Sequence, residues 1–169
     1  MIHVETAVEA PWTEAGWDAL AARAVTAALS VTPYGAIVTA GYAAEVSVLL
    51  TSDDQVRTLN REYRQKDKAT NVLSFPMVQA DMLEGLANSD DGEVLLGDIV
   101  LAHGVCAAEA AEKGVTVENH ATHLIVHGLL HLLGYDHELG EAEADHMEEL
   151  ERAALGSLGI ADPYIVRED

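Results

Sequence analysis

One strongly apolar segment, residues 116–133, limits the folds that this chain can adopt. Apolar side chains occupy most of its positions, so a helix formed here is buried on nearly all sides. Gly134 follows directly and predicts the end of that helix. The sequence therefore predicts a buried helix packed against the other elements of the domain.

The remaining hydrophobic periodicities predict a small sheet, with helices between and after its strands. Ser52 is expected to cap a helix with Gln55 at the third position of a capping box, and Gly97 to mark a bulge. Residues 77–92 indicate a mobile acidic loop. The strands are expected at 2–9, 44–51, 71–75 and 93–102, and the helices at 13–29, 53–63, 104–113, 116–133 and 141–156. This is an α+β fold: one domain over residues 1–169, with a small mixed sheet of about four strands packed with helices.

Composition excludes several classes of protein. Cys106 is the one cysteine of the chain, so an internal disulfide and a thiolate metal cluster are impossible. We expect Cys106 to be a small buried side chain. We also expect a cytoplasmic protein without a disulfide-linked partner. No apolar run reaches about 18 residues, and the first residues lack a signal-peptide pattern, so no membrane association is expected.

Three histidines lie on the apolar helix and just after it. His127 and His131 are four residues apart and project from one helix face, and His137 follows Gly134 by three residues. A chain that turns back at Gly134 brings all three imidazoles to one point. Three neutral imidazoles make a site for one divalent metal, with an open position for water. We expect Zn²⁺, although Ni²⁺ also suits such a site. The alternative is a set of buried core histidines, each of which needs polar partners.

The spacing His-x₃-His-x₂-Gly-x₂-His is similar to the zinc signature of metzincin proteases. Those proteases carry a glutamate after the first histidine as the general base, and Gly128 occupies that position here. A metal-dependent hydrolase with a different substrate is therefore expected, with a metallopeptidase as the alternative. His123 lies one turn before the first histidine and is either an orienting donor, a substrate contact or a packed side chain. Asp136 is either an orienting carboxylate or a turn residue.

The net charge of −20 argues at first against a nucleic-acid partner. The basic residues, however, are concentrated in residues 57–68, whereas the acidic residues crowd into 81–93 and 138–151. Arg64 is the expected phosphate ligand, because a guanidinium binds phosphate bidentately. The other basic residues either bind RNA or form a solvated face paired with Glu62 or Asp67; they are Arg57, Arg61, Lys66 and Lys68. The charge therefore limits where RNA touches the protein without excluding it.

Three segments resemble the YbeY family of bacterial rRNA-maturation endoribonucleases. They are NREYRQKDKATNVLSFP at 60–76, LLGDIVLA at 95–102 and HLIVHGLLHLLGYDH at 123–137, and a weaker match covers 147–164. The resemblance implies an α+β fold with a zincin-like metal-site helix. It further implies a single-strand-specific, metal-dependent endoribonuclease that acts in 16S rRNA 3′-end maturation and ribosome quality control. The implied partners are single-stranded rRNA, the small ribosomal subunit and its assembly factors.

The resemblance also assigns individual positions. The metal-binding histidines of the family correspond to His127, His131 and His137, and its important arginine corresponds to Arg64. The base stays open between a hydroxide supplied by the metal, a substrate 2′-hydroxyl and Asp136. A further alternative is a non-catalytic ribosome assembly factor with a structural metal, which normally needs four protein ligands.

Overall fold

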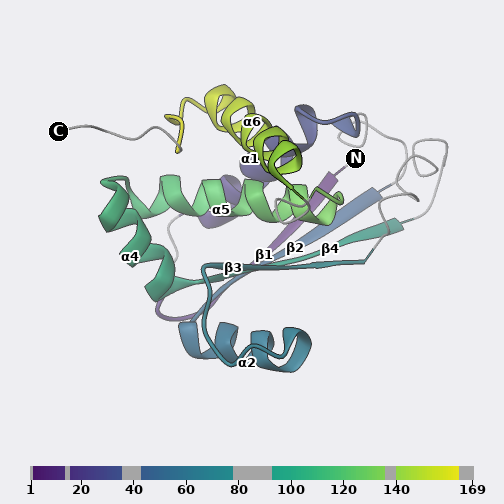
Figure 1. The fold of residues 1–169 in the computed structure, drawn as a ribbon. Helices are drawn as coiled ribbons and strands as arrows, with labels where there is room; N and C mark the ends of the chain where they lie inside the picture. Colours follow the sequence, from purple (N-terminus) through teal and green to yellow (C-terminus); the bar gives the residue numbers. More distant parts are fainter. Residues whose placement is uncertain (1, 14–15, 36–42, 78–92, 136–139, 164–169) are drawn as a thin grey trace.

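A computed structural model describes residues 2–13, 16–35, 43–77, 93–135 and 140–163 of the chain. Its frame is a sheet of four strands in the order β1-β2-β4-β3 (Figure 1). β1, β2 and β4 run parallel, and β3 pairs antiparallel with β4 at the edge of the sheet. The strands are β1 (Ile2–Val8), β2 (Ala43–Thr51), β3 (Val72–Pro76) and β4 (Glu93–Ala102). The expected mixed sheet is confirmed.

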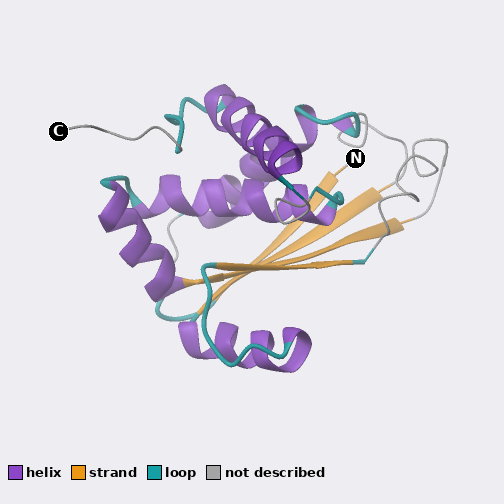
Figure 2. Ribbon diagram, in the orientation of Figure 1, coloured by secondary structure: helices purple, strands orange, loops and turns teal. Residues whose placement is uncertain are grey.

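The helices lie on both faces of this sheet. They are α1 (Trp17–Ser30), α2 (Asp53–Arg64), α4 (His103–Lys113), α5 (Val117–Leu132) and α6 (Glu141–Ser157). One face is covered by α5, with α1 and α6 packed around it, and α2 lies alone on the other face (Figures 1 and 2). The fold is thus α+β, as predicted. None of the helices in the described ranges is long and apolar enough to cross a membrane.

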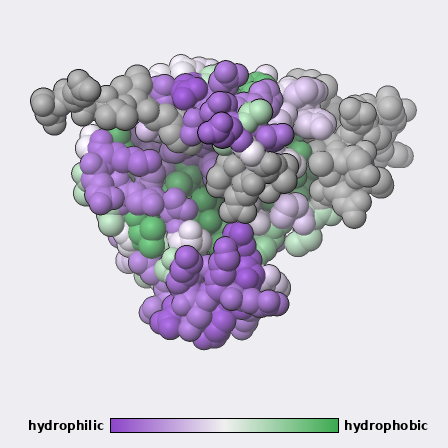
Figure 3. Space-filling model, viewed as in Figure 1, coloured by the Kyte–Doolittle hydropathy of each residue, from purple (hydrophilic) through white to green (hydrophobic). Residues whose placement is uncertain are grey.

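The main core lies between α5 and the sheet. Ile125, Leu129 and Leu132 of α5 are fully buried together with Ile99 of β4. A smaller cluster under the other face joins Val56 of α2 to side chains of β3 and β4. Only Val56 and Asn60 of α2 are buried, and this helix forms a hydrophilic projection (Figure 3). The sheet is therefore anchored firmly to α5, while α2 presents most of its surface to solvent.

Local hydrogen bonds explain where α2 begins and where α5 ends. The Ser52 hydroxyl accepts the N–H of Gln55 at 3.2 Å, which confirms the expected cap of α2. α5 ends in a Schellman motif, in which the N–H of Gly134 donates to His131 and that of Tyr135 to Leu130. Gly134 has φ +97°, a value that favours glycine, so the predicted stop is confirmed.

The predicted bulge at Gly97 is also confirmed. Glu45 pairs with Leu95 and Val46 with Gly97, so β4 carries one extra residue at this point. Gly97 has φ +152°, and a Cβ atom there would collide with the carbonyl oxygen of Phe75. A glycine is therefore required where β3 approaches β4 closely.

Two expectations differ from the structure or fall outside it. The first helix begins at Trp17 rather than at residue 13. Gly16, the residue before Trp17, has φ +76°, which lies outside the helical region, and Trp12 is tied to the sheet by its indole N–H, which donates to the Thr51 carbonyl at 2.8 Å. The expected acidic loop at 77–92 lies, apart from Met77, outside the described residues.

Candidate active site

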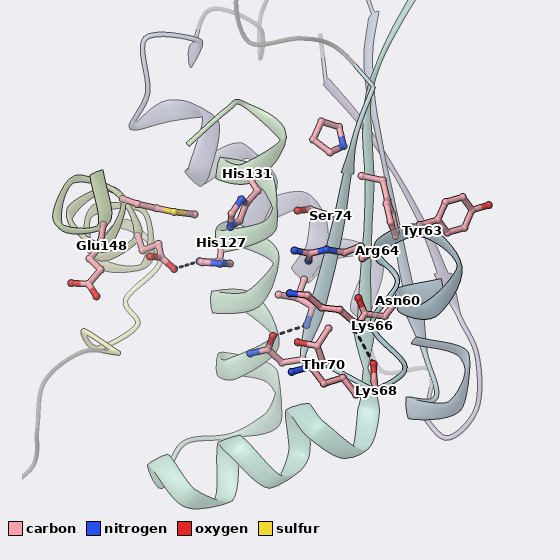
Figure 4. Close-up of a pocket in the computed structure, with 17 residues that line it drawn as sticks. Asn60, Tyr63, Arg64, Lys66, Lys68, Thr70, Ser74, His127, His131 and Glu148 are labelled. Carbon is pink, nitrogen blue, oxygen red and sulfur yellow. Dashed lines mark hydrogen bonds and ion pairs between the residues drawn. The ribbon is translucent and has the colours of Figure 1, made fainter. Parts of the chain in front are cut away.

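A cavity of about 740 Å³ opens along the outer edge of β3. Its walls come from the end of α2 and the loop after it, from β3 itself, and from α5 and α6 (Figure 4). Because β3 is an edge strand, side chains from the helices on both faces of the sheet reach the same opening. The topology thus joins segments that are far apart in the sequence.

Two of the predicted metal ligands line this cavity. His127 and His131 project from one face of α5, with ring centroids 4.8 Å apart and ring planes at 71°. His137 and Asp136 lie outside the described residues. Within the described ranges, no group of three His, Cys, Asp or Glu side chains is arranged to hold a metal. The structure therefore brings together two of the three expected ligands, next to the turn that leads to the third.

A buried carboxylate on α6 holds the histidines of α5 in place. Oε1 of Glu151 lies 2.9 Å from Nε2 of His123 and 3.0 Å from Nδ1 of His127. Burial raises the pKa of Glu151, but the hydrogen bonds from both imidazoles outweigh it and lower the pKa to about 2. The ionised carboxylate only accepts hydrogen bonds, so both facing nitrogens are donors. Nε2 is then the nitrogen of His127 that suits a metal ion.

Glu151 is the residue of this site that sequence reasoning missed. It is 1% exposed, and it shares the buried face of α6 with Met147, Ala154 and Leu155. In the sequence, a glutamate at an apolar position of an amphipathic helix indicates such a buried, paired carboxylate. The same contact defines the place of His123, which is buried, bonds to Glu151 and does not line the cavity.

The opposite wall of the cavity is basic. Arg64 is the last residue of α2, and its guanidinium points across the cavity toward α5 (Figure 4). Lys66 and Lys68 line the same wall. The loop that carries them is held by Asn60, whose side-chain amide donates to the Lys68 carbonyl at 2.9 Å. The wall that faces the imidazoles therefore suits an anionic group such as phosphate.

The other two arginines of the basic segment 57–68 do not line the cavity. Arg57 binds Asp67 through two hydrogen bonds of 2.9 and 3.2 Å, and Arg61 lies 4.0 Å from the same carboxylate. The Asp67 side chain raises the pKa of Arg57, and the Arg57 side chain lowers the pKa of Asp67. The loop after α2 thus separates the three arginines: Arg64 lies at the cavity, and the other two face Asp67 at the surface.

Gly128 explains why the protease-type glutamate has no place here. A Cβ atom at this position would lie 2.9 Å from Cγ2 of Ile99, in the core between α5 and β4. The position therefore faces the sheet and not the cavity. A glutamate there would be forced into the core, so this helix cannot present the general base of a metzincin.

A second carboxylate, that of Glu109 on α4, supports the start of β3. Glu109 of α4 accepts hydrogen bonds from His120 of α5 at 2.8 Å and from Asn71 at 3.0 Å. This places His120 in a structural role. Cys106 is buried as predicted, and burial, with a smaller contribution from Glu109, raises the pKa of its thiol to about 12.

Comparison with known proteins gives consistent results. The sequence model of the family described as Endoribonuclease YbeY matches residues 8–159. Curated proteins named Endoribonuclease YbeY include one from Rhizorhabdus wittichii, 64% identical over the full length of both chains. Another, from Sphingopyxis alaskensis, is 61% identical over 97% of this chain and 98% of its own. The solution structure of TM1509 from Thermotoga maritima shares the fold, with a TM-score of 0.52 and 21% identity over 98% of this chain and all of that one.

Proposed function

The chain belongs to the endoribonuclease YbeY family, and on that premise we propose that it is a metal-dependent endoribonuclease that cleaves single-stranded RNA. The proposed substrate is the 3′ region of 16S rRNA, with a further role in ribosome quality control. The proposed setting is the cytoplasm, with the small ribosomal subunit and its assembly factors as partners. The observation that carries the enzymatic part is the edge cavity, in which an imidazole pair faces a basic wall.

The residues at hand fit a divalent metal. His127 and His131 present imidazoles close together in the cavity, and Glu151 orients the first of them. In the proposal His137 completes the set. Zn²⁺ is our first choice, with Ni²⁺ as the second, because imidazole ligands suit both. When bound, such a metal supplies a Lewis acid and a water that ionises near neutral pH.

The protein's own side chains would then position the RNA. Arg64 binds the scissile phosphate through its two-pronged guanidinium and holds it toward the imidazoles. Lys66 and Lys68 line the same wall and neutralise neighbouring phosphates. Since only a few cations are involved, we expect modest RNA affinity that depends strongly on salt.

A direct experiment compares RNA and protein substrates. Metal-depleted protein is given Zn²⁺ and then a single-stranded rRNA fragment or casein, and His131→Ala is treated alike. We expect cleavage of the RNA and not of casein, and loss of both metal and cleavage in the variant. Cleavage of casein without RNA cleavage would replace the proposal with a metallopeptidase, against which the packing at Gly128 already argues. Intact RNA with tight binding to the small subunit would favour a non-catalytic assembly factor.

A further inference from the structure

An exposed aromatic ring stands beside the proposed phosphate ligand. Among the described residues, three large apolar side chains are exposed: Tyr63, Met77 and Leu95. Of these, only Tyr63 lines the edge cavity, and 68% of its surface is open to solvent. A large ring kept in water at the rim of a binding cavity calls for an explanation, because burying it would be favourable.

The position of Tyr63 relative to Arg64 is fixed by the end of α2. Consecutive helical residues point about 100° apart, and Figure 4 shows Arg64 directed toward α5 while Tyr63 points away from it. The Tyr63 ring also rests edge-on against Phe75 of β3, with centroids 5.5 Å apart and planes at 63°. One helix end therefore presents a guanidinium to the cavity and a supported aromatic ring to its rim.

We propose that Tyr63, supported by Phe75, is a stacking site for an unpaired nucleobase of the RNA strand whose phosphate Arg64 holds. The inference rests on the proposed function and adds how the strand is recognised. A nucleotide carries its base to one side of its phosphate, which matches the two directions in which these neighbouring side chains point. Every base has a flat aromatic face, so such a site accepts many sequences.

This arrangement also gives a physical basis for a preference for single strands. In a duplex each base is already paired and stacked on its neighbours, so no face is available to Tyr63. In a single strand the base can turn outward onto an aromatic side chain. Discrimination between the two forms therefore comes from Tyr63, whereas Lys66 and Lys68 attract phosphates of either form.

Binding in the absence of metal tests the site separately from cleavage. A short fluorescent oligoribonucleotide without secondary structure is titrated with metal-depleted protein, and the dissociation constant is read from anisotropy. We expect Tyr63→Ala to weaken binding about 5- to 150-fold, as for the loss of one stacked base. Tyr63→Phe and Tyr63→Trp should bind as the wild type does, because both keep a flat ring. Leu95→Ala, which removes another exposed apolar side chain away from the cavity, should have no effect.

Two further readouts separate stacking from charge. Tyr63→Ala should leave the salt dependence of binding unchanged, whereas Lys66→Ala should reduce its slope by about 0.7. Duplex RNA should bind the wild type and Tyr63→Ala equally. Wild-type affinity in Tyr63→Ala, or an equal loss in Tyr63→Phe, would overturn the stacking site. A wild type that binds through Tyr63 but fails to cleave with metal would refute the proposed function and leave the stacking site standing.

Discussion

Replacing Glu151 with glutamine removes the charge that holds the two imidazoles while it keeps the shape of the side chain. The carboxylate is 1% exposed and accepts hydrogen bonds at 2.9 and 3.0 Å. A hydrogen bond to a charged group contributes about 1 kcal/mol more than one between neutral groups. With two such bonds, Glu151→Gln should lower the free energy of unfolding of the metal-free protein by about 2 kcal/mol.

The same variant should bind metal less well. Carboxylates that orient a histidine ligand typically change metal affinity about 10- to 100-fold. We expect a loss of that size for Zn²⁺, measured by competition with a chromophoric chelator, alongside urea unfolding followed by circular dichroism. Glu148→Gln is the matched control, because Glu148 lines the same cavity and, among the described residues, its carboxylate makes one partly exposed ion pair, at 3.6 Å from Arg152. Such pairs contribute about 0–1 kcal/mol. Wild-type stability and Zn²⁺ affinity in Glu151→Gln would refute the reasoning.

Three other predictions concern the frame that carries the site. Asp53→Ala should destabilise the protein by about 1–2 kcal/mol in urea unfolding, because its carboxylate accepts two N–H groups at the start of α4 at 2.8 and 3.2 Å. Its neighbour Asp54 makes no such bond to α4, and Asp54→Ala should have a much smaller effect. Gly128→Ala should cost about 1–3 kcal/mol through overpacking against the sheet, and wild-type stability would show that this contact yields easily. Stability should also fall as the pH drops from 7 toward 4. Burial lowers the pKa of His120, so the unfolded chain takes up a proton below about pH 6.5 that the folded chain resists. Burial raises the pKa of Glu109, but the hydrogen bonds from His120 and Asn71 outweigh burial, so the net pKa is lowered. The stability that ionised Glu109 contributes is therefore also lost as the pH falls, at a lower pH than for His120. A flat stability profile between pH 7 and 4 would contradict this account.

The parts of the site that follow local rules could be predicted from the sequence. Four-residue spacing places His127 and His131 on one helix face, and Gly134 ends that helix in the left-handed conformation it tolerates. The cap at Ser52 and the bulge at Gly97 depend on neighbours within a few residues or on one permissive glycine. Such features are determined by residues close in the sequence, which is why they were predicted correctly.

The contacts that the sequence did not reveal join distant segments. Glu151 meets its imidazoles from another helix, and only the packing of α6 on α5 creates that contact. For the basic residues the sequence left two alternatives open, and the fold decides between them: the turn after α2 brings Asp67 to Arg57 and leaves Arg64 at the cavity. The late start of α1 accompanies a left-handed Gly16 at its N-cap and a hydrogen bond from Trp12 to β2. Each outcome needs the tertiary structure, which spacing alone does not give.

The central claim is that the edge cavity joins a metal site on α5 to a phosphate site at the end of α2. The most direct test measures metal content and RNA cleavage in parallel for Arg64→Glu and Arg57→Glu. These variants make the same charge change on one helix, but only Arg64 lines the cavity. The account predicts full metal content in both, with cleavage of a single-stranded rRNA fragment lost in Arg64→Glu and largely kept in Arg57→Glu. Equal cleavage by the two variants would contradict it.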